Sequence, residues 1–237
     1  MAIRDYLRRV YPGSAESFAA QAGEAMLREE KKFIVTANPE IMMHAEEDEA
    51  IRALLLDESV DVTPDGISVV KAMESAGLPV TERITGVDLA EKLLALAGRE
   101  KKRVYLLGAK EEVVSALAKK LTLEHPGIQV QYTNGYVPDK DAVFPAIRDF
   151  APDLVLVALG VPAQELLIAR HIGEFDKGVF MGVGGSFDVL SGSKQRAPAL
   201  FVKTNTEWLY RILREPSRLG RFYRNNVQFL KKVRKEK

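Results

Sequence analysis

The 237-residue chain has no cysteine, which excludes disulfides, thiolate metal sites and cysteine nucleophiles. Its three histidines, His44, His125 and His171, lack metal-ligand spacing such as HExxH, and no GxGxxG motif points to a dinucleotide cofactor. No stretch approaches 18 consecutive apolar residues, and the first residues lack the apolar run of a signal peptide. The sequence therefore predicts a cytoplasmic protein that does not span a membrane.

Negative charge is scarce in one part of the chain. Residues 191–237 carry 13 Lys and Arg against 3 Asp and Glu, a net charge of +10, while the rest carries −9 and the whole chain +1. An acidic body with a basic tail indicates that the tail meets something anionic, such as phosphates, a membrane surface or nucleic acid.

Short apolar runs alternate with helical patterns through most of the chain. We expect strands at 33–40, 60–63, 103–109, 128–132, 153–160 and 178–183, with helices between them, including one over 41–56. A continuous apolar run such as residues 154–159 is typical of a central parallel strand. The pattern predicts an α/β fold, a doubly wound Rossmann-like parallel sheet over residues 1–193, with a basic helical C-terminal appendage over 194–237.

The appendage itself reads as two helices, 201–214 and 217–234, interrupted at Pro216. If helical phase survives Pro216, four arginines form one basic stripe, and six apolar side chains form a second stripe. Packed helices with a solvated face, a membrane-surface helix and a nucleic-acid patch all fit. The composition favours an anionic membrane surface, and no module that reads nucleic acid is visible. Because the apolar stripe needs a cover, a homo-oligomer is also open. The two stripes are Arg211, Arg214, Arg218 and Arg221, and Leu219, Phe222, Tyr223, Val227, Leu230 and Val233.

Polar residues follow several of the expected strands, where open α/β sheets bind ligands. Asp65 follows strand 60–63 and fits a catalytic base or a cap of the next helix; spacing alone favours the cap. Gly108 ends strand 103–109 and lets a helix N-terminus approach a phosphate. Gln164 lies in the first turn of a helix near the same crevice, and Arg83 is placed to contact an anion.

An ordered set of motifs resembles the WecG/TagA/CpsF glycosyltransferases, glycosyltransferase family 26. The set runs from about residue 30 to 216, and its order is far more specific than any one member. The residues up to Gly13 lack the apolar opening strands of the family, so nothing is transferred there. The motifs are Thr36-Ala37-Asn38-Pro39-Glu40, Pro64-Asp65-Gly66, Arg83 with Gly86-Val87-Asp88, Tyr105-Leu106-Leu107-Gly108-Ala109, Gly135-Tyr136, Ala158-Leu159-Gly160 with Pro162 and Gln164-Glu165, Gly182-Val183-Gly184-Gly185-Ser186-Phe187-Asp188, Arg196-Ala197-Pro198, and Glu207-Trp208-Leu209-Tyr210-Arg211 with Glu215-Pro216.

The resemblance implies an inverting transferase that uses a UDP-sugar donor. TagA-like members of the family move N-acetylmannosamine from UDP to N-acetylglucosamine on undecaprenyl diphosphate, for the wall teichoic acid linkage unit. WecG-like members use the corresponding uronic acid, so the donor stays open. The resemblance also implies a cytoplasmic enzyme that is peripheral on the inner face of the plasma membrane, which its C-terminal segment meets.

The same resemblance implies roles for individual residues. Thr36 and Asp65 match the active site, with Asp65 as the base that accepts a proton from the acceptor hydroxyl. Asn38 is expected to contact the sugar, and Gln164 a sugar or a phosphate. Gly184 and Gly185 of the matched glycine-rich motif are expected to bind the substrate. For the diphosphate, Arg214 and Arg221 are the first candidates, followed by Arg211, Arg218 and Arg224, because a guanidinium binds phosphate bidentately.

A metal that neutralises the diphosphate would be expected at a DxD motif. The only match is Asp139-Lys140-Asp141, in a polar loop that reads as solvated. We therefore expect no metal cofactor. A non-catalytic nucleotide-binding protein that docks on membranes is the competing class, and the polar residues at several strand ends argue against it.

Overall fold

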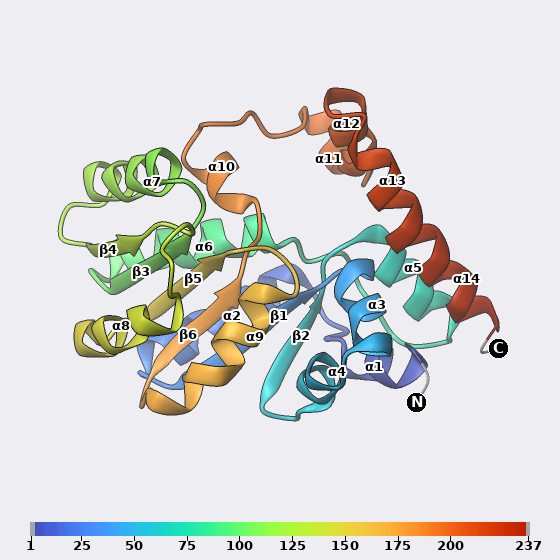
Figure 1. The fold of residues 1–237 in the computed structure, drawn as a ribbon, viewed down its shortest axis with the longest axis horizontal. Coiled ribbons are helices and arrows are strands. Elements are labelled where there is room, and N and C mark those ends of the chain that lie inside the picture. Colours follow the sequence, from blue (N-terminus) through green and yellow to red (C-terminus); the bar gives the residue numbers. More distant parts are fainter. Residues whose placement is uncertain (1–2, 236–237) are drawn as a thin grey trace.

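Six strands form one sheet in the order β2-β1-β6-β5-β3-β4 (Figure 1). All neighbouring strands are parallel, which confirms the predicted α/β fold. The computed structural model describes residues 3–235, apart from the side chains of Arg211, Arg218 and Arg221. The strands are β1 (Lys31–Ala37), β2 (Val60–Pro64), β3 (Arg103–Gly108), β4 (Gln129–Thr133), β5 (Leu154–Ala158) and β6 (Gly178–Gly182).

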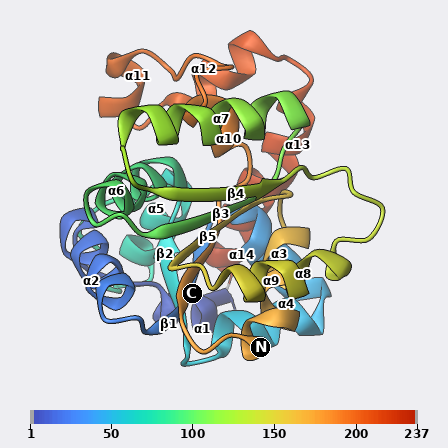
Figure 2. The same cartoon turned by 90° about the vertical axis from the view of Figure 1, so that its left-hand side faces the viewer.

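Helices lie on both sides of the sheet (Figures 1 and 2). Short 3-10 turns at Asp141–Val143 and Ile172–Glu174 flank two of them. The helices before the appendage are α1 (Ile3–Arg9), α2 (Ala15–Leu27), α3 (Pro39–Glu47), α4 (Glu49–Leu56), α5 (Ile67–Ser75), α6 (Gly86–Arg99), α7 (Glu111–Glu124), α8 (Phe144–Phe150), α9 (Ala163–His171) and α10 (Ser186–Leu190).

The sheet separates two apolar cores. Alternate strand residues point to opposite faces, so Val155 and Val157 enter one core while Leu154 and Leu156 enter the other. Helices α1, α3, α4, α5, α8 and α9 cover the first core, and α2, α6, α7 and α10 cover the second. Because both faces are buried, the central strands carry continuous apolar runs instead of alternating ones.

The N-terminal residues cover one edge of the sheet. Ile3, Tyr6 and Leu7 of α1 are buried, and Val10 forms a parallel bridge with Val62 of the edge strand β2. The Tyr11 N–H donates to the Val62 carbonyl at 2.7 Å. These contacts occupy backbone groups that would otherwise be open to pairing with another chain.

Two predicted helices are each divided in the structure. The single helix expected over 41–56 breaks at Asp48, whose side chain accepts the Ala50 N–H at 2.8 Å and so caps α4. The helix expected over 201–214 consists of α11 (Ala199–Lys203) and α12 (Glu207–Arg214), with Asn205 between them in the left-handed region at φ +57°. Asparagine adopts that conformation more readily than most residues, and it ends the first helix there.

The last helical stretch is continuous, as predicted, but α12 does not continue into it. It comprises α13 (Arg218–Phe222), a π-helical turn (Tyr223–Val227) and α14 (Gln228–Lys235). Since residues 215–217 are not helical, the condition for one continuous basic stripe across Pro216 is not met.

The end of the appendage packs on the body. Helix α14 lies against α1, α3 and α5, where Phe229 and Val233 are buried in the first core (Figure 1). Lys232 also pairs with Glu46 of α3 at 3.3 Å. The chain division at residue 193 stays a prediction. In the part of the chain that the structure describes, every helix is too short or too polar to cross a membrane.

Candidate active site

The carboxyl ends of β1 and β2 bring Thr36 and Asp65 to the same edge of the sheet. Thr36 is in register with Thr63, and Ala37 with Pro64, so Asp65 is the first residue beyond the pairing. The Asp65 N–H still donates to the Ala37 carbonyl at 2.8 Å. This bond fixes the backbone that carries the carboxylate.

The first turn of α6 lies beside these two side chains. The Ile84 N–H donates to the Pro64 carbonyl at 2.9 Å, which places the start of α6 beside the end of β2. A methyl group added at Gly86 would lie 3.5 Å from Thr36 Oγ1 and 3.7 Å from Asp65 Oδ2. The hydroxyl and the carboxylate therefore face one small volume, which Gly86 leaves open.

Asp65 does not occupy the cap position of the helix that follows it. The N-cap of α5 is Gly66, whose φ of +141° is a conformation that side chains rarely adopt. The interpretation of Asp65 as the N-cap is therefore wrong by one position. The half-buried Asp65 carboxylate borders the space beside Gly86, as the Thr36 hydroxyl does.

Thr36 and Asn38 make different contacts although they are close in sequence. Thr36 is 5% exposed, and its hydroxyl donates to the Gly182 carbonyl of β6 at 3.3 Å. The Asn38 side-chain oxygen accepts the backbone N–H groups of Glu40 and Ile41, at 2.9 and 3.1 Å, and so caps α3. The oxygen of Asn38 is thus committed to the helix, and only its amide nitrogen is left to contact a sugar.

Gln164 lies beneath the site, where it joins two loops. It is 1% exposed, and its oxygen accepts the N–H groups of Gly160 and Gly184, at 3.1 and 2.9 Å. Its amide nitrogen donates to Glu165 Oε1 at 2.7 Å. Gln164 was expected to contact a sugar or phosphate itself, but its burial and these bonds limit it to shaping the loops after β5 and β6.

Glu165 is an acid that the sequence prediction did not assign. It is fully buried, and this burial raises its pKa to about 7; Glu40 also raises the pKa, whereas the hydrogen bond from Gln164 lowers it.

The three glycines predicted in the site, Gly108, Gly184 and Gly185, have different structural roles. A Cβ on Gly108 would lie 2.3 Å from the Ala158 carbonyl oxygen, so this position needs glycine for close approach of β3 to β5. The helix that follows, α7, has Glu111 and Glu112 in its first turn, which disfavours a phosphate there. Gly184 adopts φ +50°, and Gly185 is the N-cap of α10.

Arg83 belongs to a buried charged cluster between the body and the appendage. Its Nη2 donates to Glu207 Oε2 of α12 at 2.6 Å, with the two side chains only 11% and 7% exposed. Arg196 lies 3.5 Å from the other Glu207 oxygen and donates two hydrogen bonds to Asp88 of α6. Burial raises the pKa of Asp88, but the bonds from Arg196 and Thr85 outweigh it, so this pKa is lowered overall.

The DxD match is used structurally. Asp139 Oδ1 accepts the N–H groups of Asp141 and Ala142, at 2.9 and 3.2 Å. Asp141 lies 2.7 Å from Nε2 of His171 and 3.3 Å from Arg170, and hydrogen bonding by His171 lowers the pKa of Asp141. Within residues 3–235, no three acidic or histidine side chains group in a way that could hold a metal ion.

The described arginines of the appendage lie on its surface. Arg214 and Arg224 are exposed, and Arg214 donates to the Tyr210 hydroxyl at 3.2 Å. The predicted contacts of Arg211, Arg218 and Arg221 lie outside the described residues, because the structure describes only their backbone.

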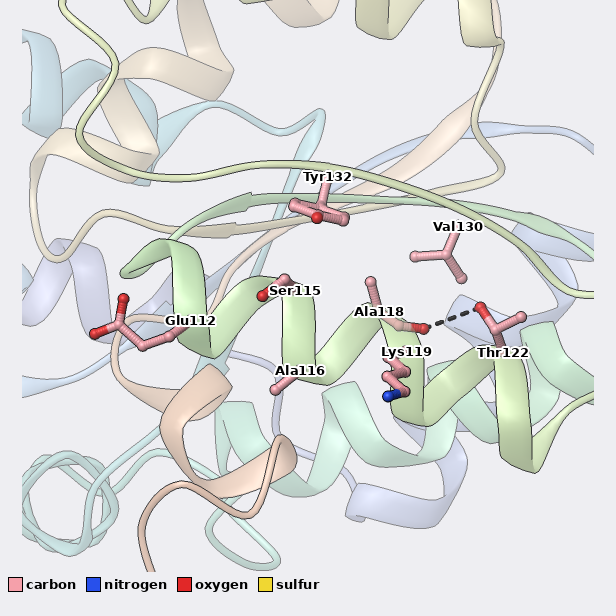
Figure 3. A pocket seen from close by; sticks show the side chains of 8 residues that line it. All are labelled: Glu112, Ser115, Ala116, Ala118, Lys119, Thr122, Val130 and Tyr132. Atoms are coloured by element: carbon pink, nitrogen blue, oxygen red, sulfur yellow. Dashed lines mark hydrogen bonds between the residues drawn. The ribbon is translucent and has the colours of Figure 1, made fainter.

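A separate hollow lies between α7 and the edge strand β4 (Figure 3). Glu112, Ser115, Lys119 and Thr122 of α7 line it together with Val130 and Tyr132 of β4. None of the predicted site residues is among those lining it, so this hollow is not part of the candidate active site.

Four residues of this region had no predicted role: Gly86, Glu165, Arg196 and Glu207. Each stands inside a motif that carried the family resemblance. The available signal was therefore their position in those motifs. Their contacts join segments that are far apart in the chain. Arg83 and Glu207, for example, are 124 positions apart in sequence.

Most of the chain is similar to known proteins of one family. The model of the "Glycosyl transferase WecG/TagA/CpsF family" matches residues 7–237. A protein of Bacillus spizizenii is 42% identical over 191 residues, covering 80% of this chain and 74% of its own. One of Staphylococcus aureus (strain MW2) is 40% identical over 206 residues, covering 86% and 80%. Both are named N-acetylglucosaminyldiphosphoundecaprenol N-acetyl-beta-D-mannosaminyltransferase.

Proposed function

Because the chain belongs to the WecG/TagA/CpsF family of glycosyl transferases, we propose that it transfers N-acetylmannosamine from UDP-N-acetylmannosamine to N-acetylglucosamine on undecaprenyl diphosphate. The names of the relatives from Bacillus spizizenii and Staphylococcus aureus support the acceptor and the transferred sugar. The transfer inverts the anomeric centre.

The space that Thr36 and Asp65 share is the observation that most supports this function. An inverting transfer needs a base for the acceptor hydroxyl on the face opposite the leaving diphosphate. Asp65 Oδ2 faces the volume beside Gly86 and takes that proton, while the Thr36 hydroxyl, held against Gly182, contacts the sugar. The base contributes about 10²–10⁴-fold to the rate.

The departing diphosphate needs positive charge. Arg83 is a candidate that lies close to Asp65 in the fold of the chain: it precedes Ile84, whose N–H donates to the Pro64 carbonyl, and Pro64 immediately precedes Asp65. Its guanidinium is paired with Glu207, so the appendage and the diphosphate share the same cation. The surface arginines Arg214 and Arg224 remain candidates for contact with the diphosphate, because both side chains are exposed.

The part of the appendage that precedes α14 forms the surface that meets the membrane. Large apolar side chains are exposed along residues 200–223, beside basic residues. This composition is typical of helices that lie in a membrane interface. In contrast, α14 is covered by the body through Phe229 and Val233, so both the packed and the membrane-surface interpretations apply, each to its own part. The exposed set is Leu200, Trp208, Leu209, Leu213, Leu219 and Tyr223.

The deciding experiment supplies the protein with UDP-N-acetylmannosamine and a lipid-linked N-acetylglucosamine diphosphate. We expect UDP release and a β-linked product, identified by its anomeric coupling in NMR. A parallel reaction with the uronic acid donor tests the WecG-like alternative. Release of UDP from neither donor would contradict the proposal and favour a non-catalytic nucleotide-binding protein. A further reaction in chelator tests metal independence, because restoration by Mg²⁺ would show that arginines alone do not neutralise the diphosphate.

A further inference from the structure

Glu165 is a buried acid that has no role in the proposed transfer mechanism. It is 0% exposed, and its Oε2 has no hydrogen-bond partner among the described residues. A buried carboxyl with one unpaired oxygen costs free energy, so it needs an explanation in the contacts it does make. Its other oxygen, Oε1, accepts the amide of Gln164 at 2.7 Å.

We propose that Glu165 is a positioning residue for the transfer reaction, which fixes the amide of Gln164 and thereby the loops and the Gly182 carbonyl that hold Thr36. This inference rests on the proposed function, since it assigns Thr36 to the reacting sugar. Glu165 acts only through its neighbours and touches no reacting atom.

The orientation of the Gln164 amide is the first step. Two backbone donors, the N–H groups of Gly160 and Gly184, converge on its oxygen at 3.1 and 2.9 Å. A reversed amide would turn its NH₂ group toward these two donors, and three unsatisfied donors would then face one another. The carboxyl of Glu165 gives the NH₂ group an acceptor on the other side, and so selects the orientation that joins the two loops.

Gly182 transmits this arrangement to the active site. A Cβ on Gly182 would lie 2.6 Å from Gln164 Nε2 and 2.9 Å from Glu165 Oε1, so the pair is packed directly against its backbone. The carbonyl of the same glycine accepts the Thr36 hydroxyl at 3.3 Å. A contiguous path therefore runs from Glu165 and Gln164 through Gly182 to Thr36, which faces Asp65 across Gly86.

The protonation of Glu165 agrees with this role. Its pKa is raised to about 7, mainly by burial and in smaller part by Glu40 of α3, the charged side chain that acts on it from a neighbouring element, while the hydrogen bond from Gln164 lowers it. At lower pH the side chain is a neutral acid, and the oxygen that accepts the Gln164 amide keeps that hydrogen bond. Ionisation would leave a buried carboxylate with a hydrogen bond to only one of its two oxygens, and so would disturb the loops that the pair holds.

Two substitutions separate positioning from simple packing. Glu165→Gln keeps an oxygen for the Gln164 amide but cannot ionise, whereas Glu165→Leu has a similar volume and no acceptor. We expect Glu165→Gln to keep kcat within about threefold at pH 6 and to lack the decline through pH 7 of the unsubstituted protein. We expect Glu165→Leu to lose kcat by about tenfold to a hundredfold, with a smaller change in KM for the donor.

Hydrogen exchange provides a readout that needs no substrate. In the full chain, Glu165→Leu should accelerate exchange at the N–H groups of Gly160 and Gly184, and Glu165→Gln should leave it unchanged. Equal kinetics and exchange for Glu165→Leu and the unsubstituted protein would overturn the proposal, as would equal impairment of the two variants. A pH profile of Glu165→Gln that coincides with the unsubstituted one would also overturn it, even if Glu165→Leu does not fold. If no donor is turned over, the proposed function fails, while exchange still tests the positioning.

Discussion

The hydroxyl of Thr36 and the carboxylate of Asp65 border one small volume, since a single methyl group at Gly86 would touch both, at 3.5 and 3.7 Å. The two residues are 29 positions apart in sequence and come together because β1 and β2 are adjacent parallel strands in register. Their shared space is the feature from which the proposed chemistry follows.

Asp65→Asn is the direct test of the base. The amide has nearly the same shape but cannot accept the proton of the acceptor hydroxyl at neutral pH, so we expect turnover to fall by roughly 10²-fold or more. Initial rates of UDP release at saturating substrates measure this. Donor affinity, measured by titration, and the melting temperature should change little. Near-normal turnover by this variant would assign the base to another group.

Gly86→Ala tests whether the space beside Asp65 is used. Its added methyl group meets Thr36 at 3.4 Å or more, an ordinary contact distance, and we expect the fold to be retained. The methyl group nevertheless fills the volume in front of the carboxylate, which should lower kcat/KM by about tenfold or more. Gly173→Ala is the matched control, because a Cβ there meets nothing within 4 Å. Equal activity of both variants would show that substrate does not enter this space.

Much of this arrangement was predictable from local patterns. Ser14 precedes an amphipathic stretch, the usual place of an N-cap, and it caps α2 with its hydroxyl accepting the Ser17 N–H at 3.2 Å. The strands were recognisable because both faces of the sheet are buried, which makes runs such as 154–158 apolar throughout. Asp65 was found by its position, since it directly follows the strand expected at 60–63.

The remaining features depend on contacts that sequence spacing does not encode. Gln164 was expected to contact a ligand because it begins a helix at a strand end, but the N–H groups of Gly160 and Gly184 occupy its oxygen. Arg83 was expected to contact an anion, and it does, but the anion is Glu207 of the appendage. In both cases the residue type indicated the interaction and only the fold supplied the partner.

Glu207→Gln should loosen the attachment of α11 and α12 to the body. The substitution removes the charge that lies between Arg83 and Arg196, and hydrogen bonds to charged groups are worth about 1.5–3 kcal/mol. We expect amide exchange over residues 199–214 to accelerate by roughly tenfold or more. Exchange in α14 should not change, because Phe229 and Val233 hold that helix independently. Glu124→Gln, the same change at an exposed position, is the control. Uniform acceleration along 199–235 would contradict separate attachment of these helices and α14.

The buried acid Glu165 predicts a pH dependence of stability. Its carboxyl ionises at about 4.5 when unfolded and about 7 when folded, so between these values unfolding releases a proton. The free energy of unfolding should therefore fall as the pH rises from about 4.5 to about 7, by roughly 3 kcal/mol at most, and this contribution stays constant above that range. Glu165→Gln should lack the decline, which denaturant titrations of both proteins at pH 5, 6, 7 and 8 would measure. Parallel curves for the two proteins would show that Glu165 does not carry a raised pKa.

Leu213→Glu tests the proposed membrane surface. Leu213 is 66% exposed in α12, where nothing of the body covers it, so a charge should leave the fold intact. Transfer of a leucine side chain into an apolar phase is worth about 1.5–3 kcal/mol, and we expect binding to phosphatidylglycerol vesicles to weaken by about tenfold or more. Leu123→Glu is the matched control, since Leu123 is 71% exposed on α7 and lies outside the appendage. Sedimentation with vesicles measures the binding of both variants.

Equal weakening by the two variants would place the membrane contact outside α12. No binding by the unsubstituted protein would show that the chain does not bind this membrane surface. Selective weakening by Leu213→Glu would instead tie the membrane to the helix that also holds Glu207 against Arg83, beside the start of the Asp65 site.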